Sequence, residues 1–295
     1  MNFSVVVPVR DELTLIRQTL WSYYEIDPSE VLVCTDKPCK RNVVHLIKRI
    51  AALVNMGDVT RIIEVKKTPE WGFHQAHVRR SGFHEAKFDR ILTGDIDLLV
   101  NRNVYKALNL VGKNDIGLAS LGKFHYPSSL LDYWRLGVET FLRKIVHDIM
   151  DFSMETTAFT GLYALWKPYW LDSEPEEEAK RLVNPKQVLR GEISDFDLAS
   201  GYAGEDTFLR DWMSKKHRCV YLKDIGAIDF GKSLESHSFI QYSAGAYFGA
   251  KGRSLPVSIG RAILRAQPHY LRGYLAGRSR RRRASYRQLC TASLQ

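Results

Sequence analysis

The chain has 295 residues, of which 45% are hydrophobic and 26% are charged. These values exclude an intrinsically disordered protein, and the length suits one large α/β domain, or one domain with a substantial appendage. The four cysteines form neither a CxxC pair nor a disulfide-rich pattern, which favours reduced thiols in a cytosolic protein.

The formal net charge of +10 is concentrated at the C-terminal end. From Ser236 onward the sequence contains no Asp or Glu but eleven Lys and Arg residues, which leaves residues 1–235 close to neutral. We therefore predict a neutral body over 1–235, with halves at about 1–100 and 101–235, and a basic extension over 236–295. We expect no signal peptide, because the chain begins directly with a strand and has no basic leader.

The first 65 residues alternate apolar strands with amphipathic helices. Strands are predicted at 3–9, 30–34 and 61–65, and helices at 11–24 and 41–55. This alternation predicts a parallel, doubly wound sheet with helices on both faces. Ligands of such sheets bind beyond the carboxyl ends of the strands. We therefore expect residues 8–12 and Asp36 to surround one crevice.

The stretch 90–100 carries the most informative acidic motif. A buried strand ends at Gly94 and is followed by Asp95 and Asp97. In an extended chain, residues two apart point to the same side, so both carboxylates can address one point. Hard oxygen ligands of this kind suit Mg²⁺ or Mn²⁺ together with phosphate oxygens. Acidic pairs at this spacing also arise by chance, so the motif is weak by itself.

A helix is predicted over 71–86, carrying Arg79 and Arg80. Its histidines, His74, His77 and His84, have near-helical spacing, but no fourth ligand accompanies them, which favours partly exposed side chains over a metal site. Further along, an amphipathic helix is predicted over 130–150, a strand from 159, and a solvated acidic loop over 172–178.

Glu205 and Asp206 open a predicted helix after a glycine-rich approach. Acidic residues at a helix N-terminus are commonly capping residues, because they compensate the positive end of the helix dipole. A cap accounts for one acid but not for the pair, so we favour a catalytic role, which can coexist with capping.

Taken in order, these motifs resemble the family 2 glycosyltransferases with the GT-A fold, over residues 3 to about 226. Val5-Val-Val-Pro-Val-Arg-Asp-Glu is similar to the opening strand and turn of the family. Val33-Cys-Thr-Asp stands at its nucleobase site, Val78-Arg-Arg-Ser-Gly at its arginine motif, and Gly94-Asp-Ile-Asp at its metal motif. Phe159-Thr-Gly is similar to its acceptor-side strand, and Gly204-Glu-Asp-Thr to the motif that holds its base.

The resemblance implies a Rossmann-like, mostly parallel sheet, followed here by a basic helical extension. It also implies a metal-dependent, inverting transfer of one sugar from a UDP- or GDP-sugar. Its site residues carry over as follows: catalytic Asp206 and Glu205; nucleotide-sugar-binding Pro8, Val9, Arg10, Glu12, Asp36, Arg79, Asp95 and Ile96; Mn²⁺- or Mg²⁺-binding Asp97 and Asp95, with Asp229 or His237 as a further ligand; and acceptor-side Thr160, Gly161 and Lys167.

Two other functions would each account for part of the sequence. A sugar-1-phosphate nucleotidyltransferase would share the sheet and the metal, but it should open with a glycine-rich loop, and residues 8–12 contain no glycine. A nucleic-acid-binding protein would explain Arg280 to Arg283 and a pI near 9.4, but the basic residues are confined to the tail and have few interleaved aromatics.

The segment 255–277 mixes arginines with Leu, Ile and Tyr and is interrupted by Pro268. Short amphipathic helices of this kind lie in the membrane interface, and adjacent basic clusters are attracted to anionic lipid. We therefore expect peripheral attachment to the cytoplasmic face of a membrane, with a glycan or a lipid-linked molecule as the acceptor. The alternative is that the segment packs on the catalytic domain.

Overall fold

The computed structural model describes residues 1–10, 12–125, 134, 161–173, 176–182, 205–230, 242, 245–246, 248–249, 252, 254–264 and 268–279. Two compact units are distinguished. The first comprises Met1–Tyr126, Ser153–Leu182 and Glu205–Gly231, and the second comprises Pro127–Phe152, Val183–Gly204 and Lys232–Gln295. Thr160, His237 and nearly all of the predicted helix over 130–150 lie outside the described residues.

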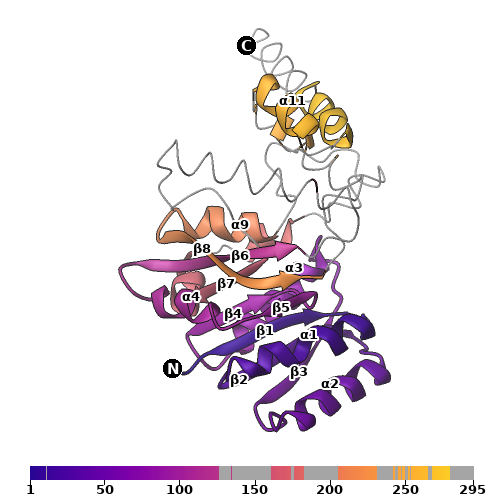
Figure 1. The fold of residues 1–295 in the computed structure, drawn as a ribbon, viewed down its shortest axis with the longest axis vertical. Helices are drawn as coiled ribbons and strands as arrows, with labels where there is room; N and C mark the ends of the chain where they lie inside the picture. Colours follow the sequence, from indigo (N-terminus) through magenta and orange to yellow (C-terminus); the bar gives the residue numbers. More distant parts are fainter. Residues whose placement is uncertain are drawn as a thin grey trace. The chain divides into compact units, whose positions relative to one another are not determined.

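The first unit is built on one eight-stranded sheet (Figure 1). The strands are β1 (Ser4–Val9), β2 (Glu30–Lys37), β3 (Thr60–Lys66), β4 (Arg90–Gly94), β5 (Leu98–Val100), β6 (Ile116–His125), β7 (Leu162–Trp166) and β8 (Arg218–Asp229). Their order in the sheet is β3-β2-β1-β4-β7-β6-β8-β5. The β1–β2, β2–β3, β1–β4 and β6–β8 pairs are parallel, and the remaining three are antiparallel.

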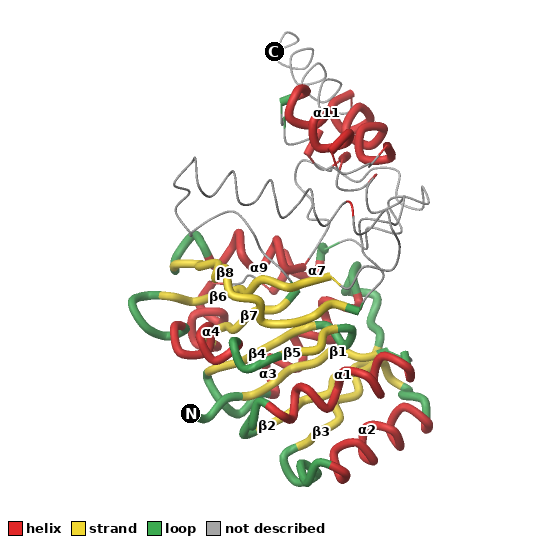
Figure 2. The backbone as a smooth tube through the Cα atoms, in the orientation of Figure 1, coloured by secondary structure: helices red, strands yellow, loops and turns green. Residues whose placement is uncertain are grey.

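Helices cover both faces of this sheet, as Figure 2 shows. The described helices of the unit are α1 (Leu13–Glu25), α2 (Arg41–Leu53), α3 (His74–Glu85), α4 (Val104–Leu110), α6 (Lys167–Ser173), α7 (Glu176–Lys180) and α9 (Glu205–Met213). Buried residues of α1, α2 and α4 share one apolar cluster with the sheet, whereas those of α3, α6 and α9 share another. The result is a three-layer α/β arrangement, as the sequence predicts.

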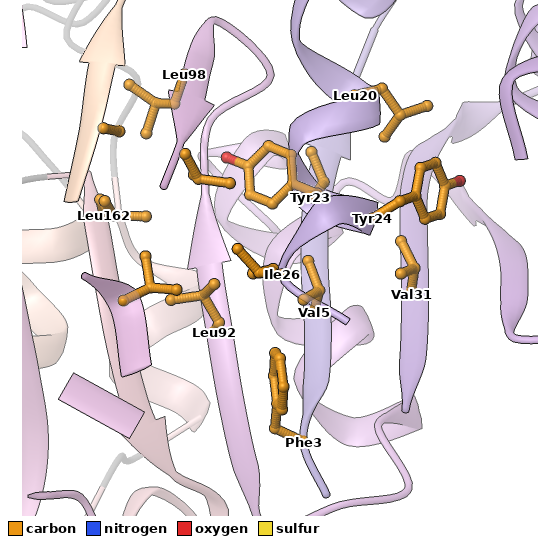
Figure 3. Close-up of a cluster of buried hydrophobic side chains, with 14 of the residues drawn as sticks. Phe3, Val5, Leu20, Tyr23, Tyr24, Ile26, Val31, Leu92, Leu98 and Leu162 are labelled. Atoms are coloured by element: carbon orange, nitrogen blue, oxygen red, sulfur yellow. The ribbon is translucent and has the colours of Figure 1, made fainter. Parts of the chain in front are cut away.

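The first apolar cluster lies where α1 crosses β1, β4 and β5 (Figure 3). Val5, Leu92 and Leu98 are completely buried there, together with Leu20 and Tyr23 of α1. Because β1 is covered on both faces, it reads as a continuous apolar run rather than as an alternating one. This packing fixes the carboxyl ends of β1 and β4 side by side.

The structure differs from the sequence prediction mainly after residue 95. The predicted strands and helices of the first 65 residues are confirmed to within about three residues at each boundary. By contrast, β5, α4, β6 and β8 were not predicted. The acidic stretch 172–178, predicted as a loop, includes the end of α6 and the start of the short helix α7. Glu176 and Glu177 are nevertheless exposed, so the predicted contact of these two residues with solvent is confirmed.

Gly82 allows α3 to approach the sheet closely. A Cβ atom at this position would lie 2.4 Å from Val6 Cγ1 and 2.6 Å from Cys34 Sγ, both in the interior of the sheet.

We expect Gly82→Ala to lower the free energy of unfolding by about 1–3 kcal/mol, because the core has to shift to admit a methyl group. Gly57→Ala is the matched control, since a Cβ there meets nothing within 4 Å. Urea denaturation of both variants measures the difference, and equal stabilities would contradict the packing described here.

The second unit contains α11 (Leu255–Leu264), a helix over residues 268–279, and further helical residues at 242, 245–246 and 248–249. Glycines let two of these helices approach closely. A Cβ on Gly245 or Gly249 would lie 1.9 or 2.2 Å from the carbonyl oxygen of Tyr270 or Tyr274, and one on Gly273 or Gly277 would lie 2.0 Å from a carbonyl oxygen of Tyr242 or Ala246. We call this arrangement the four-glycine pair. Among the described residues, no helix has both the length and the hydropathy required to cross a bilayer.

Candidate active site

The chain turns sharply where β4 ends. The amide of Leu98 donates to the carbonyl oxygen of Asp95 at 3.2 Å, so Asp95, Ile96 and Asp97 form a turn between β4 and β5. The chain is therefore not extended at Asp95–Asp97, and that part of the expectation is wrong. The physical reason is that β5 leaves β4 and pairs with β8, which requires the chain to change direction at Asp95. The Asp95 carboxylate pairs with Arg79, whereas Asp97 Oδ1 is buried without a hydrogen-bond partner.

Arg79 joins three carboxylates that are distant in sequence. Its guanidinium contacts the Asp95 carboxylate, and its Nη1 lies 2.8 Å from Glu205 Oε1 and 3.0 Å from Asp206 Oδ1. We call these four residues the Arg79 cluster. The Arg79 side chain is only 3% exposed, so the three acids compensate a buried positive charge. The cluster brings together α3, the end of β4 and the start of α9.

Asp206 remains accessible within this cluster, with 30% of its side chain exposed, whereas Glu205 is buried. Burial and the neighbouring Glu205 and Asp95 raise the pKa of Asp206 to about 7, against the opposing effect of Arg79. Both acids lie in the first turn of α9, where the helix dipole favours negative charge. Helix stabilisation and a catalytic role are therefore compatible, and Asp206 is the member of the pair that a ligand can reach.

Gly161 lies beside the two accessible carboxylates. A Cβ atom on Gly161 would be 2.9 Å from Asp95 Oδ2 and 3.8 Å from Asp206 Oδ2. Gly161 immediately precedes β7, whose first residue, Leu162, pairs with Gly94. Position 161 thus contributes no side chain to the space beside Asp95 and Asp206.

A second group of charges lies beyond the turn. Lys123 of β6 places its Nζ 2.7 Å from Asp229 Oδ2 in a buried ion pair. Asp97 is close to this pair, and burial, Asp95 and Asp229 raise the pKa of the Asp97 carboxyl to about 7. We call Lys123, Asp97 and Asp229 the Lys123 cluster. The β5–β8 ladder assembles it, because Leu98 pairs with Asp229 and the Phe230 amide donates to the Asp97 carbonyl oxygen.

Asp97 is the best-suited metal ligand of the two clusters. Its Oδ1 is buried and accepts no hydrogen bond, so an oxygen ligand is available there. Mg²⁺ and Mn²⁺ sites commonly use one or two carboxylates and complete their coordination with water and substrate phosphates. Among the described residues, no group of three or more His, Cys, Asp or Glu is arranged to hold a metal. Because Asp229 is engaged by Lys123, Asp97 and Asp95 are the two carboxylates of this edge that a metal with further water and phosphate ligands would use.

Helix α1 holds the turn through three hydrogen bonds. The Tyr23 hydroxyl donates to the Asp95 carbonyl oxygen at 2.8 Å, and the Thr19 hydroxyl donates to that of Ile96. The Val100 amide donates to Ser22 Oγ at 3.0 Å. Figure 3 shows the Tyr23 ring lying between α1 and the strand that carries Leu98. These contacts fix the backbone that presents both aspartates.

Tyr23→Phe tests this support. Loss of one buried hydrogen bond is expected to lower the free energy of unfolding by about 0.5–1.5 kcal/mol and to loosen the Asp95 turn. We expect a several-fold weaker Mn²⁺ affinity, measured by isothermal titration calorimetry. Tyr24→Phe is the matched control, because the Tyr24 hydroxyl is 3.2 Å from the Thr60 hydroxyl, on another element. If both variants lose stability equally and bind Mn²⁺ equally, Tyr23 does not position the turn.

The predicted nucleotide-binding residues lie at the carboxyl ends of β1 and β2. Pro8 and Val9 are buried at the end of β1, Arg10 is exposed, and Glu12 accepts a hydrogen bond from the Arg10 amide at 3.0 Å. Asp36 is half exposed, with its Oδ1 3.0 Å from His74 Nε2. Ile96 is buried in the turn. This is the edge of the sheet at which ligands of parallel α/β folds bind.

Lys167, predicted to be on the acceptor side, lies at the other end of the sheet. Since β7 is antiparallel to β4, Gly161 lies beside the end of β4 but Trp166 pairs with Arg90 at its start. The ammonium of Lys167 donates to the carbonyl oxygens of His84 and Ala86 at 2.7 Å, and so caps the end of α3. The five residues of β7 separate it from Gly161, so the two Cα atoms lie on the order of 20 Å apart, which is too far for both residues to contact one hydroxyl.

The sequence reasoning missed Lys123 and Tyr23. A lysine within the apolar run Leu118 to Phe124 was the available signal for Lys123, because a charge in a buried strand needs a partner. For Tyr23 no local signal existed, because its hydroxyl donates a hydrogen bond to the carbonyl oxygen of Asp95, 72 positions later in the chain.

The chain was compared with known proteins. No protein-family model and no curated protein matches the sequence. The fold resembles that of a mannosyltransferase, PcManGT from Pyrobaculum calidifontis, solved in complex with GDP-Man and Mn²⁺. The two are 18% identical with a TM-score of 0.53, over 99% of this chain and 79% of that one. It also resembles TarS from S. aureus, at 14% identity and a TM-score of 0.52, over 92% of this chain and 48% of that one. The chain thus spans about half the length of TarS. These likenesses show a GT-A-like fold.

Proposed function

We propose that the protein is a metal-dependent glycosyltransferase that moves one sugar from a nucleotide-sugar donor to an acceptor, with inversion at the anomeric carbon. The observation that carries this proposal is the accessible Asp206 carboxylate beside Asp95, on a sheet edge that also presents Asp97. The fold it shares with a structure that contains GDP-Man and Mn²⁺ supports the same reaction class.

Asp206 is the proposed general base. Its carboxylate accepts the proton of the acceptor hydroxyl while the hydroxyl oxygen attacks the anomeric carbon and the bond to the nucleoside diphosphate breaks. A pKa near 7 suits this role, because the group is then both deprotonated and basic enough near neutral pH. One base acting on the face opposite the leaving group gives inversion without a covalent glycosyl-enzyme.

Arg79 is proposed to position the base and to keep the site charge-balanced. It holds Asp206 by one oxygen, Oδ1 at 3.0 Å, while the other, Oδ2, faces the space beside Gly161. Glu205, buried behind Asp206, fixes the guanidinium by its 2.8 Å contact. In this role Arg79 is a positioning residue, whereas the resemblance implies a contact between Arg79 and the nucleotide sugar.

The donor is proposed to lie over the carboxyl ends of β1 and β2, beside Pro8, Val9, Arg10, Glu12 and Asp36, with its diphosphate towards Ile96 and the two aspartates. Mn²⁺ or Mg²⁺ held by Asp97 and Asp95 would supply positive charge to the departing diphosphate. The acceptor, a glycan or a lipid-linked molecule, is proposed to approach Asp206 past Gly161, which has no side chain of its own.

A thermal-shift screen tests the donor and the metal together. A ligand bound only by the native state raises the melting temperature, so the correct UDP- or GDP-sugar should do so in the presence of Mn²⁺ and much less in its absence. Release of nucleoside diphosphate from the same donor then reports turnover. If no nucleotide sugar shifts the melting temperature with either metal, the proposed function is wrong.

A further inference from the structure

Helix α11 presents an apolar face outward. Val257, Ile259 and Ile263 are 53%, 37% and 68% exposed, and Pro256 beside them is exposed too. Pro256, Ile259 and Ile263 are spaced three and four residues apart and follow one line along the helix, and Val257 lies at the edge of this exposed face, one turn before Arg261. We call Pro256, Val257, Ile259 and Ile263 the α11 stripe.

The one charged side chain of α11 packs against other residues of the second unit. The Arg261 guanidinium lies 4.8 Å from the ring centroid of Tyr270 and 5.7 Å from that of Phe248, and Tyr270 is completely buried. Cation–π contacts of this kind hold a guanidinium against aromatic faces. The helix is thus inverted relative to an ordinary surface helix, which buries its apolar residues and exposes its charges.

The support beneath the stripe is closely packed. The four-glycine pair brings its two helices to backbone contact, an arrangement favoured between helices in lipid. All Lys, Arg, Asp and Glu residues of the surrounding segment are basic, since residues 236–295 contain eleven Lys and Arg and no Asp or Glu. An anionic surface therefore matches the charge of this segment, and an apolar layer beneath that surface matches the stripe.

We propose that the α11 stripe inserts into the interfacial region of an anionic lipid bilayer. An amphipathic helix buries its apolar side at the boundary between headgroups and acyl chains, and flanking basic residues add attraction to anionic headgroups. The helix has ten residues and lies in the membrane plane rather than crossing it. This surface goes beyond the proposed catalytic function, and vesicle binding is measured without any donor or acceptor.

The test compares two sets of substitutions in the full-length chain. One changes the stripe (Val257→Asn, Ile259→Asn, Ile263→Asn), and the matched set changes three exposed apolar residues of the first unit (Leu53→Asn, Val54→Asn, Leu171→Asn), which are 74%, 36% and 53% exposed. Cosedimentation with vesicles of phosphatidylglycerol and phosphatidylcholine, or of phosphatidylcholine alone, gives the partition coefficient. We expect the stripe variant to partition on the order of 10-fold or more weakly into anionic vesicles, and the matched variant to bind like the parent.

Two further measurements decide the remaining outcomes. Ile263→Trp, which keeps the stripe apolar, should retain binding and show new fluorescence that brominated lipid quenches. Raising NaCl from about 0.1 to about 0.5 M should weaken binding, because screening reduces attraction to anionic headgroups. The proposal is overturned by equal partitioning of the two Asn variants, by equal binding to neutral and anionic vesicles, or by absence of quenching. It is also overturned if the parent dimerises through the stripe without binding vesicles.

Discussion

Asp206→Asn is expected to lower the turnover number by on the order of 10²-fold or more while leaving donor affinity nearly unchanged. Asparagine keeps the shape of the side chain and can still accept the hydrogen bond from Arg79, but it cannot take up the proton of an acceptor hydroxyl. Single-turnover kinetics and calorimetric titration of the donor separate the two quantities. The control is Asp211→Asn, on the same helix and with the same 30% exposure, whose carboxylate pairs with Arg210.

A pH profile provides an independent test of the same residue. Because only the deprotonated carboxylate acts as a base, kcat/KM should rise with pH through about 7, the pKa to which burial raises Asp206. This rise should disappear from the residual activity of the Asn variant. A collapse of donor affinity in Asp206→Asn would instead identify a binding residue. Lower stability with nearly normal turnover would assign Asp206 only to helix capping.

Asp97→Asn is expected to abolish metal-dependent donor binding while preserving the fold. An amide is a much weaker ligand than a carboxylate for Mg²⁺ or Mn²⁺, so Mn²⁺ titration should detect no binding at concentrations that saturate the parent.

The pKa of Asp97 is raised, which means that the folded protein binds this proton more tightly than the unfolded chain does. Stability without metal should therefore fall as pH rises from about 4 to about 7, and the Asn variant should lose part of that fall.

Asp224→Asn serves as the control for this charge removal. Asp224 also lies on β8 but pairs with Lys106 at the surface, 2.5 Å away. We expect it to bind Mn²⁺ and donor like the parent. Unchanged Mn²⁺ affinity or turnover in Asp97→Asn would show that the metal, if the reaction uses one, is held elsewhere.

The sequence was most informative where local pattern decides structure. Buried parallel strands are continuous apolar runs, so β1 and β2 were visible, and their carboxyl ends located the crevice beside Asp36. The pairing of Glu205 and Asp206 with the start of α9 was predicted as well. Their approach to Arg79 was not, because it depends on how α3 and α9 pack and not on any neighbouring residue.

Two errors have a common physical origin, the change of strand direction in the second half of the sheet. The resemblance placed Lys167 on the acceptor side together with Gly161, but antiparallel β7 takes it to the opposite end of β4. The Asp95–Asp97 segment was read as extended, but the pairing of β5 with β8 requires a turn. Strand direction and partner are nonlocal properties, so residue spacing alone could not supply either.

The position of β5 also determines when the site can exist during synthesis. In the sheet order β5 is the outermost strand, and β8 is its only ladder partner among the described strands. A nascent chain can therefore complete β1 to β4 long before Asp97 acquires its neighbour Asp229, since β8 begins at Arg218. Domains generally begin to fold from the N-terminal side as they leave the ribosome, and contacts of high sequence separation form late. A ribosome-bound chain arrested before β8 has emerged should thus hold a folded β1 to β4 but no assembled Lys123 cluster, so that the proposed metal site is complete only once almost the whole first unit has been made.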